Sequence, residues 1–188
     1  TSNVRCIDKA FLSLTRQEQT DLLQDIDALI TDEPRQCIGI STADCVPVLI
    51  HDKVHQAVAA IHAGWRGTVK RISQNALSMM HEKYGTIASD CVAVIGPSIS
   101  QQAFEVGNEV RIAFEEAGFP TSIIDSTTWT KPHIDLWAAN VYLLEEAGVK
   151  LSNIQIANVC TYVHSDVFFS ARKLGINSGR IYSAIFLN

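Results

Sequence analysis

The sequence predicts an α+β fold with mixed sheets, in which short strands and helices alternate along 188 residues. Apolar runs of strand length are interspersed with segments of helical apolar spacing. Two of the runs, Val46–Ile50 and Ala57–Ile61, are separated by the polar segment HDKVHQ and predict an antiparallel hairpin. A doubly wound parallel sheet does not contain such a hairpin, so a mixed-sheet architecture is favoured.

Three elements are predicted before the hairpin. Asn3–Ile7 and Cys37–Ser41 have the length and composition of short strands. Thr15–Ile30 indicates a helix or a long polar connection, because its apolar side chains share one helical face. These side chains are Leu22, Leu23, Ile26, Leu29 and Ile30.

After the hairpin, helical and strand-like segments continue to alternate. Helices are predicted over Val69–Tyr84, Asn108–Gly118 and Asp135–Ala147, and strands over Cys91–Ile95, Ile154–Val159 and Ile181–Leu187. Gly85 is expected to end the first of these helices, and Asn108 is expected to cap the second. Phe168 and Phe169 are expected in the core rather than as a stacking platform.

Length and charge limit the classes of function. The length favours one domain, residues 1–188, and the apolar content of 47% is ample for a core. The net charge is −5 and no window is rich in Lys or Arg, which argues against nucleic-acid and anionic-membrane partners. No apolar run approaches the roughly 20 residues of a membrane helix. Because the chain begins at Thr1 rather than Met, an upstream segment is expected.

Cysteine usage indicates a reducing compartment. The chain has five cysteines, an odd number, with no C-x-x-C pair and no signal peptide at its start. A secreted disulfide framework is therefore not favoured, and the cytoplasm is the expected location. Three of the cysteines, Cys6, Cys37 and Cys91, have apolar or strand-like neighbours and are interpreted as small buried hydrophobes.

The predicted hairpin brings a thiol and an imidazole to one sheet edge. Cys45 precedes its first strand and His62 follows its second, so antiparallel pairing places them together. Thiolate and imidazole are ligands for zinc, and equally for copper. A catalytic zinc usually takes three protein ligands. The residues therefore supply two ligands, and a third His, Cys or carboxylate is needed.

The other histidines are screened by distance from this edge. His51 and His55 belong to the far end of the hairpin, and His81 lies well down the following helix, so all three are interpreted as surface residues. His133 and His164 lie in predicted loops and stay open as ligands. The alternative for Cys45 and His62 is a purely structural role, as a buried thiol beside a hydrogen-bonded histidine.

The residues that flank the pair favour a functional site. Asp44 could accept a hydrogen bond from a ligand imidazole, as carboxylates behind metal ligands do. The segment Gly64–Thr68 joins a strand to a helix, and its glycines, free N–H groups and Arg66 suit a phosphate or carboxylate. Arg172 and Arg180 could complete an anion pocket, or they could be surface charges.

Several segments together resemble the YfiH family, also called laccase-domain or polyphenol-oxidase-like proteins. The matching segments run in family order over most of the chain: TADCVPVLI, HAGWRGT, IGPSISQQAFEVG, HIDLWAAN, CTY, FFSARK and the final GR. FFSARK departs from the family pattern at Ala171 and Lys173, which leaves Arg172 as the matching basic residue.

The resemblance implies a cytoplasmic enzyme with a layered α/β/β/α fold and one metal, zinc or in some members copper, held by His, Cys and His. Cys45 and His62 match the last two ligands. The first ligand has no match here and is expected upstream of Thr1. Cys45, His62 and Arg66 then become the candidate catalytic residues, and Arg66 and Arg172 the candidate phosphate-binding residues.

The activity that the resemblance implies is phosphorolysis of purine nucleosides, namely adenosine, inosine and methylthioadenosine, together with adenosine deamination. The laccase name fits less well, because the sequence has no His-x-His pair for a multicopper centre. Two alternatives stay open. One is a metal-free hydrolase or amidase acting on peptidoglycan precursors, with Cys45 as nucleophile and His62 as base. The other is a non-catalytic protein that binds a metabolite.

Overall fold

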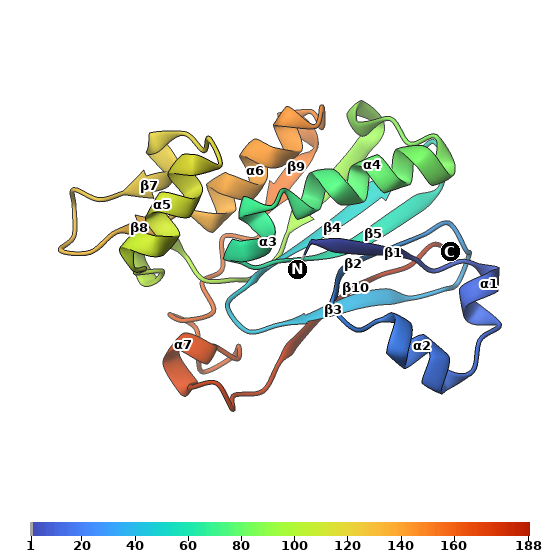
Figure 1. The fold of residues 1–188 in the computed structure, drawn as a ribbon, viewed down its shortest axis with the longest axis horizontal. Coiled ribbons are helices and arrows are strands. Elements are labelled where there is room, and N and C mark those ends of the chain that lie inside the picture. Colours follow the sequence, from blue (N-terminus) through green and yellow to red (C-terminus); the bar gives the residue numbers. More distant parts are fainter. Residues whose placement is uncertain (1) are drawn as a thin grey trace.

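The computed structural model describes residues 2–188, and they form a layered α+β fold (Figure 1). The central layer is a six-stranded mixed sheet in the order β1-β2-β5-β4-β6-β9, and a two-stranded antiparallel sheet, β10-β3, lies against it. The strands are β1 (Asn3–Cys6), β2 (Ile26–Thr31), β3 (Ile38–Thr42), β4 (Val46–Asp52), β5 (Ala57–Ala63), β6 (Cys91–Ile95), β7 (Ile124–Asp125), β8 (His133–Ile134), β9 (Ile154–Ile156) and β10 (Ile181–Ile185).

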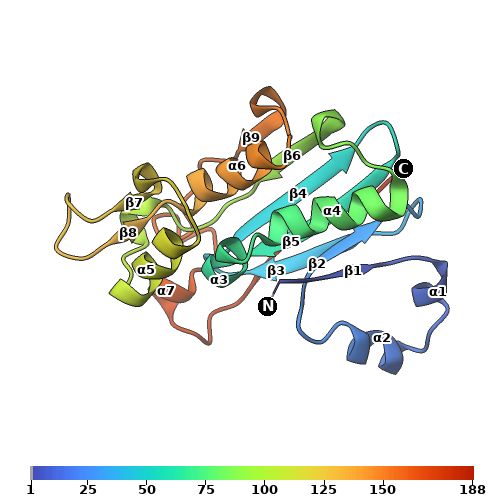
Figure 2. The same ribbon diagram turned by 45° about the horizontal axis from the view of Figure 1, so that its top comes forward.

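Helices cover one face of the large sheet, and the small sheet covers part of the other (Figures 1 and 2). The longer helices α4 and α6 lie across the first face, with α3 at their end, while α1, α2 and α7 flank the small sheet. The helices are α1 (Lys9–Leu12), α2 (Arg16–Leu22), α3 (Trp65–Val69), α4 (Ile72–Tyr84), α5 (Asn108–Glu116), α6 (Leu136–Glu146) and α7 (Ala171–Leu174). The layered mixed-sheet architecture predicted from the sequence is confirmed.

Strand β5 separates two cores because its side chains alternate between the two faces. Ala59 and Ile61 point into the larger core under the helices. Val58 and Ala60 point into a smaller core shared with the small sheet, which includes Ile40. By the same alternation, His62 belongs to the face of Val58 and Ala60, and it lies at the end of the space between the two sheets.

The predicted helix or connection over Thr15–Ile30 is wrong in its second half. Helix α2 ends at Leu22, and strand β2 begins at Ile26. Asp25 between them has a left-handed backbone (φ 56°), which no helix interior accommodates. A buried strand and a helix segment both give apolar runs, so spacing alone does not separate them.

Other expected boundaries shift for local reasons. The helix predicted over Val69–Tyr84 is two helices, because Arg71 between α3 and α4 adopts φ 60°. Gly85 ends α4 in the left-handed conformation, as predicted. Asn108 is the first residue of α5 rather than its cap, which is Gly107 without a side-chain hydrogen bond. The expectation that Phe169 lies in the core is wrong, since 47% of its surface is exposed.

Candidate functional site

The β4–β5 hairpin brings Cys45 and His62 together as the sequence predicts. The two strands pair antiparallel, with Val46 opposite Ala63 and Pro47 opposite His62. Cys45 immediately precedes β4, so its thiol lies beside the end of β5. The register of a single hairpin therefore sets the relative position of the two candidate ligands.

Gly64 forms a cradle between the thiol and the imidazole. A Cβ at this position would lie 3.0 Å from Cys45 Sγ and 3.7 Å from His62 Nε2. The two donor atoms thus face the same small space, which only a residue without a side chain leaves open. This space belongs to a cavity of about 150 Å³ lined by Asp27, Cys45, His62 and the loop residues 64–67.

His62 Nε2 is buried and has no hydrogen-bond partner among residues 2–188. A buried polar atom without a partner costs free energy, so such an atom at the wall of a cavity marks a place for a ligand. Burial lowers the pKa of His62, against the opposing effect of the nearby Asp27 carboxylate. The imidazole is therefore neutral at neutral pH, which is the form that binds a metal.

Burial, together with the carboxylates of Asp44 and Asp27, raises the pKa of the Cys45 thiol to about 11 against the opposing charge of Arg180. A cysteine that acts as a nucleophile on its own needs a lowered pKa. The surroundings of Cys45 do the reverse, and a bound cation is the group that would stabilise its thiolate.

The pair fits part of a metal site. A thiol and a neutral imidazole face one cavity, and sulfur and nitrogen donors suit zinc or copper. Within residues 2–188, however, no three His, Cys, Asp or Glu residues are arranged to hold a metal ion. The chain thus supplies two convergent donors, and the described residues do not supply a third.

Asp27 is a site residue that the sequence reasoning missed. Its Oδ1 lies 3.7 Å from His62 Nδ1. The pairing of Ala28 with Ile61 places Asp27 and His62 next to each other on neighbouring strands. A carboxylate behind a ligand imidazole orients the ring, the role expected for Asp44. The interpretation of this region as a helix concealed Asp27, because only a strand directs it toward His62.

Asp44 does a different task from the one expected. Its carboxylate accepts hydrogen bonds from Thr161 Oγ1 and from the backbone N–H of Arg172, both at 2.7 Å. Its own carbonyl accepts a hydrogen bond from Ile99 N at 2.9 Å. Asp44 is 9% exposed and has a left-handed backbone, φ 79°. It therefore ties three distant segments to the Cys45 loop, and the prediction that it orients an imidazole is wrong.

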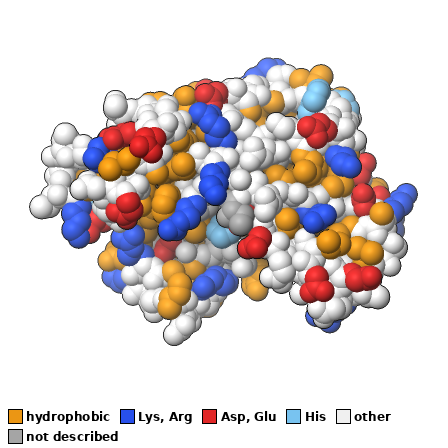
Figure 3. Space-filling model, viewed as in Figure 1, with side chains coloured by type: hydrophobic (Ala, Val, Ile, Leu, Met, Phe, Trp, Pro, Cys, Tyr) orange, Lys and Arg blue, Asp and Glu red, His pale blue; other side chains and the backbone are white. Residues whose placement is uncertain are grey.

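The candidate anion-binding residues lie at different places. Arg66 lines the cavity and stacks on Trp65, with its guanidinium 4.1 Å from the ring centroid. Arg172 donates to the Glu105 carbonyl at 3.0 Å and approaches the site through Asp44 rather than as part of the cavity wall. Figure 3 shows Lys and Arg side chains gathered over α3 and toward α5, so this side of the cavity is basic.

Arg180 is also fixed near the site. Its guanidinium donates to three carbonyls of its own loop, those of Ile176, Ser178 and Gly179. Its charge lowers the pKa of Cys45, although Arg180 is not among the residues that line the cavity. Of the three candidate arginines, Arg66 lines the cavity, whereas Arg172 and Arg180 donate to backbone carbonyls outside its wall.

The remaining histidines lie elsewhere. His55 Nδ1 pairs with Asp52 at 2.9 Å in the distal turn, and His81 Nδ1 contacts the Thr86 carbonyl at 2.9 Å, so both are remote as predicted. His133, left open as a ligand, is 5% exposed and stacks on Trp129 with ring centroids 4.2 Å apart. His164, also left open, lies in an exposed turn.

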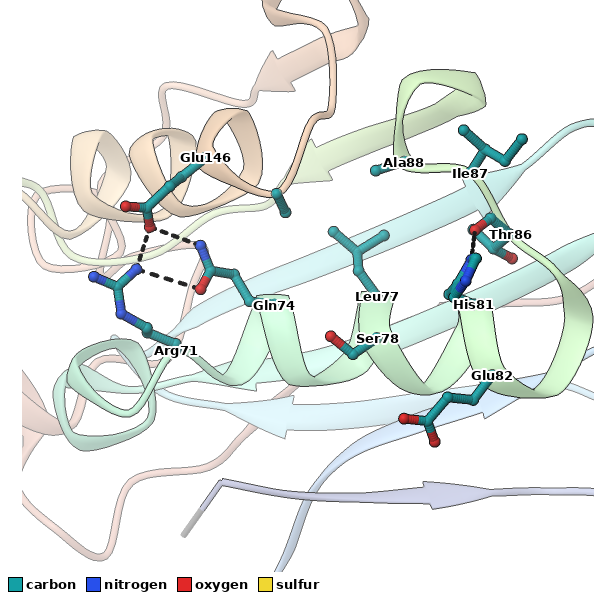
Figure 4. A pocket seen from close by; sticks show the side chains of 11 residues that line it. Arg71, Gln74, Leu77, Ser78, His81, Glu82, Thr86, Ile87, Ala88 and Glu146 are labelled. Carbon is teal, nitrogen blue, oxygen red and sulfur yellow. Dashed lines mark hydrogen bonds and ion pairs between the residues drawn. The ribbon is translucent and has the colours of Figure 1, made fainter.

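A much larger hollow lies away from the thiol. A groove of about 800 Å³ lies between α4, α6 and the turn 86–88 (Figure 4). Figure 4 shows Arg71, Gln74 and Glu146 joined at one end and His81 bonded to Thr86 at the other, with Leu77 between them. These polar groups already have partners within the chain. Cavity volume alone would therefore point to this groove, whereas the convergent donor atoms of Cys45 and His62 point to the smaller cavity.

Residues 2–188 match the family model described as "Multi-copper polyphenol oxidoreductase laccase". A purine nucleoside phosphorylase of Bacteroides thetaiotaomicron is 51% identical over the whole chain, which covers 70% of that protein. Adenosine deaminase RL5, from an unknown prokaryotic organism, is 43% identical over 97% of the chain and 70% of its own length.

The fold agrees with this relationship. The crystal structure of the hypothetical protein YfiH of Bacillus licheniformis superimposes with a TM-score of 0.90 at 27% identity, covering the whole chain and 71% of that protein. The resemblance inferred from the motifs is confirmed. The chain belongs to the YfiH family of laccase-like proteins, the family of the model that it matches from residue 2 to residue 188.

Proposed function

We propose that the chain is a purine nucleoside phosphorylase, whose centre is a metal held by Cys45 and His62. The observation that carries the proposal is the pair of donors facing one cavity across Gly64, with the partnerless His62 Nε2 beside the Arg66 loop. The names of the relatives support the choice of purine nucleosides as substrates.

Phosphorolysis suits an anion site next to an electrophile. A phosphate oxygen attacks the anomeric carbon of the ribose, the bond to purine N9 breaks, and the purine leaves with the electron pair and takes up a proton. Arg66 and Arg180 would hold the phosphate through charge-assisted hydrogen bonds. The neutral His62 and Cys45 would hold zinc or copper, which supplies Lewis acidity when bound.

We propose that the third metal ligand comes from outside residues 2–188. Strand β1 pairs with β2, and its first residue, Asn3, lies opposite Ile26, next to Asp27. The start of β1 therefore lies at the His62 end of the sheet. We also propose that residues 1–188 form a single catalytic domain and that the protein is cytoplasmic. All five cysteines are free thiols, which suits a reducing compartment. No helix within residues 2–188 has the length and apolarity to cross a membrane.

Adenosine deamination is a second candidate, supported by the relative named adenosine deaminase. A metal-free cysteine hydrolase acting on peptidoglycan precursors is less well supported, because the pKa of Cys45 is raised to about 11. A non-catalytic protein that binds a metabolite is the third candidate; the same cavity would suit it, but the names of the relatives do not support it.

The test measures adenine release from adenosine with and without phosphate, together with metal content, for the wild type and Cys45→Ala. We expect about one equivalent of metal in the wild type and phosphate-dependent adenine release, and loss of both in the variant. Cys37→Ala serves as the control, because Cys37 does not line the cavity and is exposed, so its interpretation as a buried hydrophobe is wrong. Wild-type activity in Cys45→Ala would contradict the proposal.

A further inference from the structure

His62 stands between two cavities rather than beside one. The first is the cavity of about 150 Å³ with the Arg66 loop. A second cavity, of about 250 Å³, adjoins the first at Asp27 and His62, which line both. Sites for small molecules usually enclose about 300–1,000 Å³, so the first cavity is too small for a nucleoside and phosphate together. The second adds the missing room.

The walls of the second cavity differ from those of the first. They come from β2, β3 and the end of α2, and most are aliphatic: Leu23, Ile26, Leu29 and Ile40. Ile40 belongs to the core between the two sheets, and Leu29 packs against that core. The cavity is therefore the open end of an apolar interior. Polar groups are confined to Ser41 and the shared residues Asp27 and His62.

Charge separates the two cavities as well. The first contains Arg66, and the charge of Arg180 reaches it. The second contains no Lys or Arg in its wall; Asp27 lines both cavities, so the difference in charge comes from the cations on the side of the first. A phosphate is thus directed to the first cavity. A flat, largely apolar ring with N–H donors on its edge suits the second, because aliphatic side chains pack on its faces and carboxylate and hydroxyl oxygens accept at its edge.

We propose that the second cavity is the subsite for the purine base, with Leu23 as a residue that contacts the ring. This inference rests on the proposed function for the identity of the ligand. The ribose would then span the shared residues Asp27 and His62, with its anomeric carbon between base and phosphate. Such an arrangement places the attacking phosphate and the leaving purine on opposite sides, as a direct displacement requires.

The chain offers a matched pair of variants to test the subsite. Leu22 and Leu23 are neighbours at the end of α2 with similar exposure, 38% and 36%. Leu23 lines the proposed subsite, whereas Leu22 lines a separate cavity beside Phe11. Leu23→Trp fills the subsite, and Leu22→Trp adds the same bulk outside it. Leu23→Ala removes apolar contact without any risk of overpacking.

The measurement is calorimetric titration of each variant of the full chain with adenine alone and with inorganic phosphate alone, after circular dichroism has matched their folds. We expect adenine binding about tenfold weaker in Leu23→Trp, a loss of about 1.4 kcal/mol, and weaker by a smaller factor in Leu23→Ala. Phosphate binding should stay unchanged in both, and Leu22→Trp should match the wild type with both ligands.

The result separates the subsite from the activity. If adenine binding is weakened only in the Leu23 variants while the wild type does not phosphorolyse adenosine, the subsite stands and the proposed function fails. Unchanged adenine binding in both Leu23 variants would overturn the subsite. Equal losses in Leu22→Trp and Leu23→Trp, or a loss of phosphate binding instead of adenine binding, would overturn it too.

Discussion

The two ends of the β4–β5 hairpin carry the same residue types in opposite states. At the distal turn, Asp52 is fully buried and accepts hydrogen bonds from the backbone N–H groups of Val54 and His55 and from the His55 ring. At the other end, Asp27 lies 3.7 Å from His62, whose Nε2 has no partner within residues 2–188. The Asp52–His55 pair thus stabilises a turn, whereas the Asp27–His62 pair lines an open site.

The difference teaches that satisfaction of polar groups, rather than residue type, separates structure from function. At the distal end, both carboxylate oxygens of Asp52 have hydrogen-bond partners, which stabilises the turn. The proximal end keeps a nitrogen, His62 Nε2, that has no partner among the described residues, together with a left-handed Asp44 and a glycine where any side chain would fill the space. Such features destabilise a fold and persist where a ligand compensates for them. Substitutions at the two ends should therefore affect different properties.

The largest effect is expected from Gly64→Ala. The new methyl group would lie 3.0 Å from Cys45 Sγ and fill the cradle. We expect phosphorolysis to fall by about 100-fold, or about 2.7 kcal/mol of transition-state stabilisation, with little change in the melting temperature. Gly67→Ala is the control, because its Cβ meets His62 O and Ile72 Cγ2 only at 3.4 Å. Equal losses in the two variants would show that the loop, and not the cradle, matters.

Asp44→Ala should give the next largest effect, because it frees Thr161 and the backbone N–H of Arg172 from the Cys45 loop. Loss of a residue that supports a metal ligand typically costs 10–100-fold in metal affinity or activity, and we expect a loss in this range. Asn also tolerates the left-handed backbone, so Asp44→Asn should recover part of the activity. Steady-state kinetics on both variants makes the comparison; an inactive Asp44→Asn beside an active Asp44→Ala would refute the role.

Asp52→Asn should act on stability alone. Burial alone would raise the pKa of Asp52, but the hydrogen bonds from the backbone N–H groups of His55 and Val54 and from the His55 ring outweigh it and lower the pKa below its usual value. A carboxyl with a lowered folded-state pKa stabilises the protein above its unfolded-state pKa, and loses that contribution as the pH falls through the folded-state pKa.

We therefore expect Asp52→Asn to lower the free energy of unfolding by about 1–3 kcal/mol at pH 7. The gap to the wild type should narrow as the pH falls below about 4. Urea unfolding at a series of pH values measures both. Activity per folded molecule should stay at the wild-type level, and a large activity loss would contradict the separation between the two ends.

The smallest effect is expected from Arg71→Ala, in the large groove of Figure 4. Arg71 pairs with Glu146 and bonds Gln74, but both charged side chains are about one-third or more exposed. Exposed ion pairs contribute about 0–1 kcal/mol. Thermal unfolding should change by that amount and phosphorolysis should not change. A loss of activity here would assign the groove a role in catalysis.

The features that could be predicted from the sequence are those set by neighbouring residues, above all the β4–β5 hairpin. The hairpin register follows from two apolar runs around a polar turn, so the pairing of Cys45 with His62 could be predicted before any coordinates. The strand β2 could not, because its apolar run continues the spacing of the preceding helix and the break lies in the backbone of Asp25. Because β2 was not predicted, Asp27 was not recognised as a site residue.

The role of Asp44 could not be predicted for a different reason. Its partners, Thr161 and Arg172, lie more than a hundred residues further along the chain. No spacing rule connects residues at such a distance. The family motifs indicated that these segments belong together, and the hydrogen bonds of one carboxylate give the physical reason.

The most direct test compares His62→Asn with His55→Asn, one histidine from each end of the hairpin. Metal content by elemental analysis and phosphate-dependent adenine release are measured on both variants and on the wild type. We expect His62→Asn to lose the metal and the activity while it keeps its fold, and His55→Asn to keep both the metal and the activity with reduced stability. Full metal content and activity in His62→Asn would contradict the assignment of this end of the hairpin as the catalytic centre.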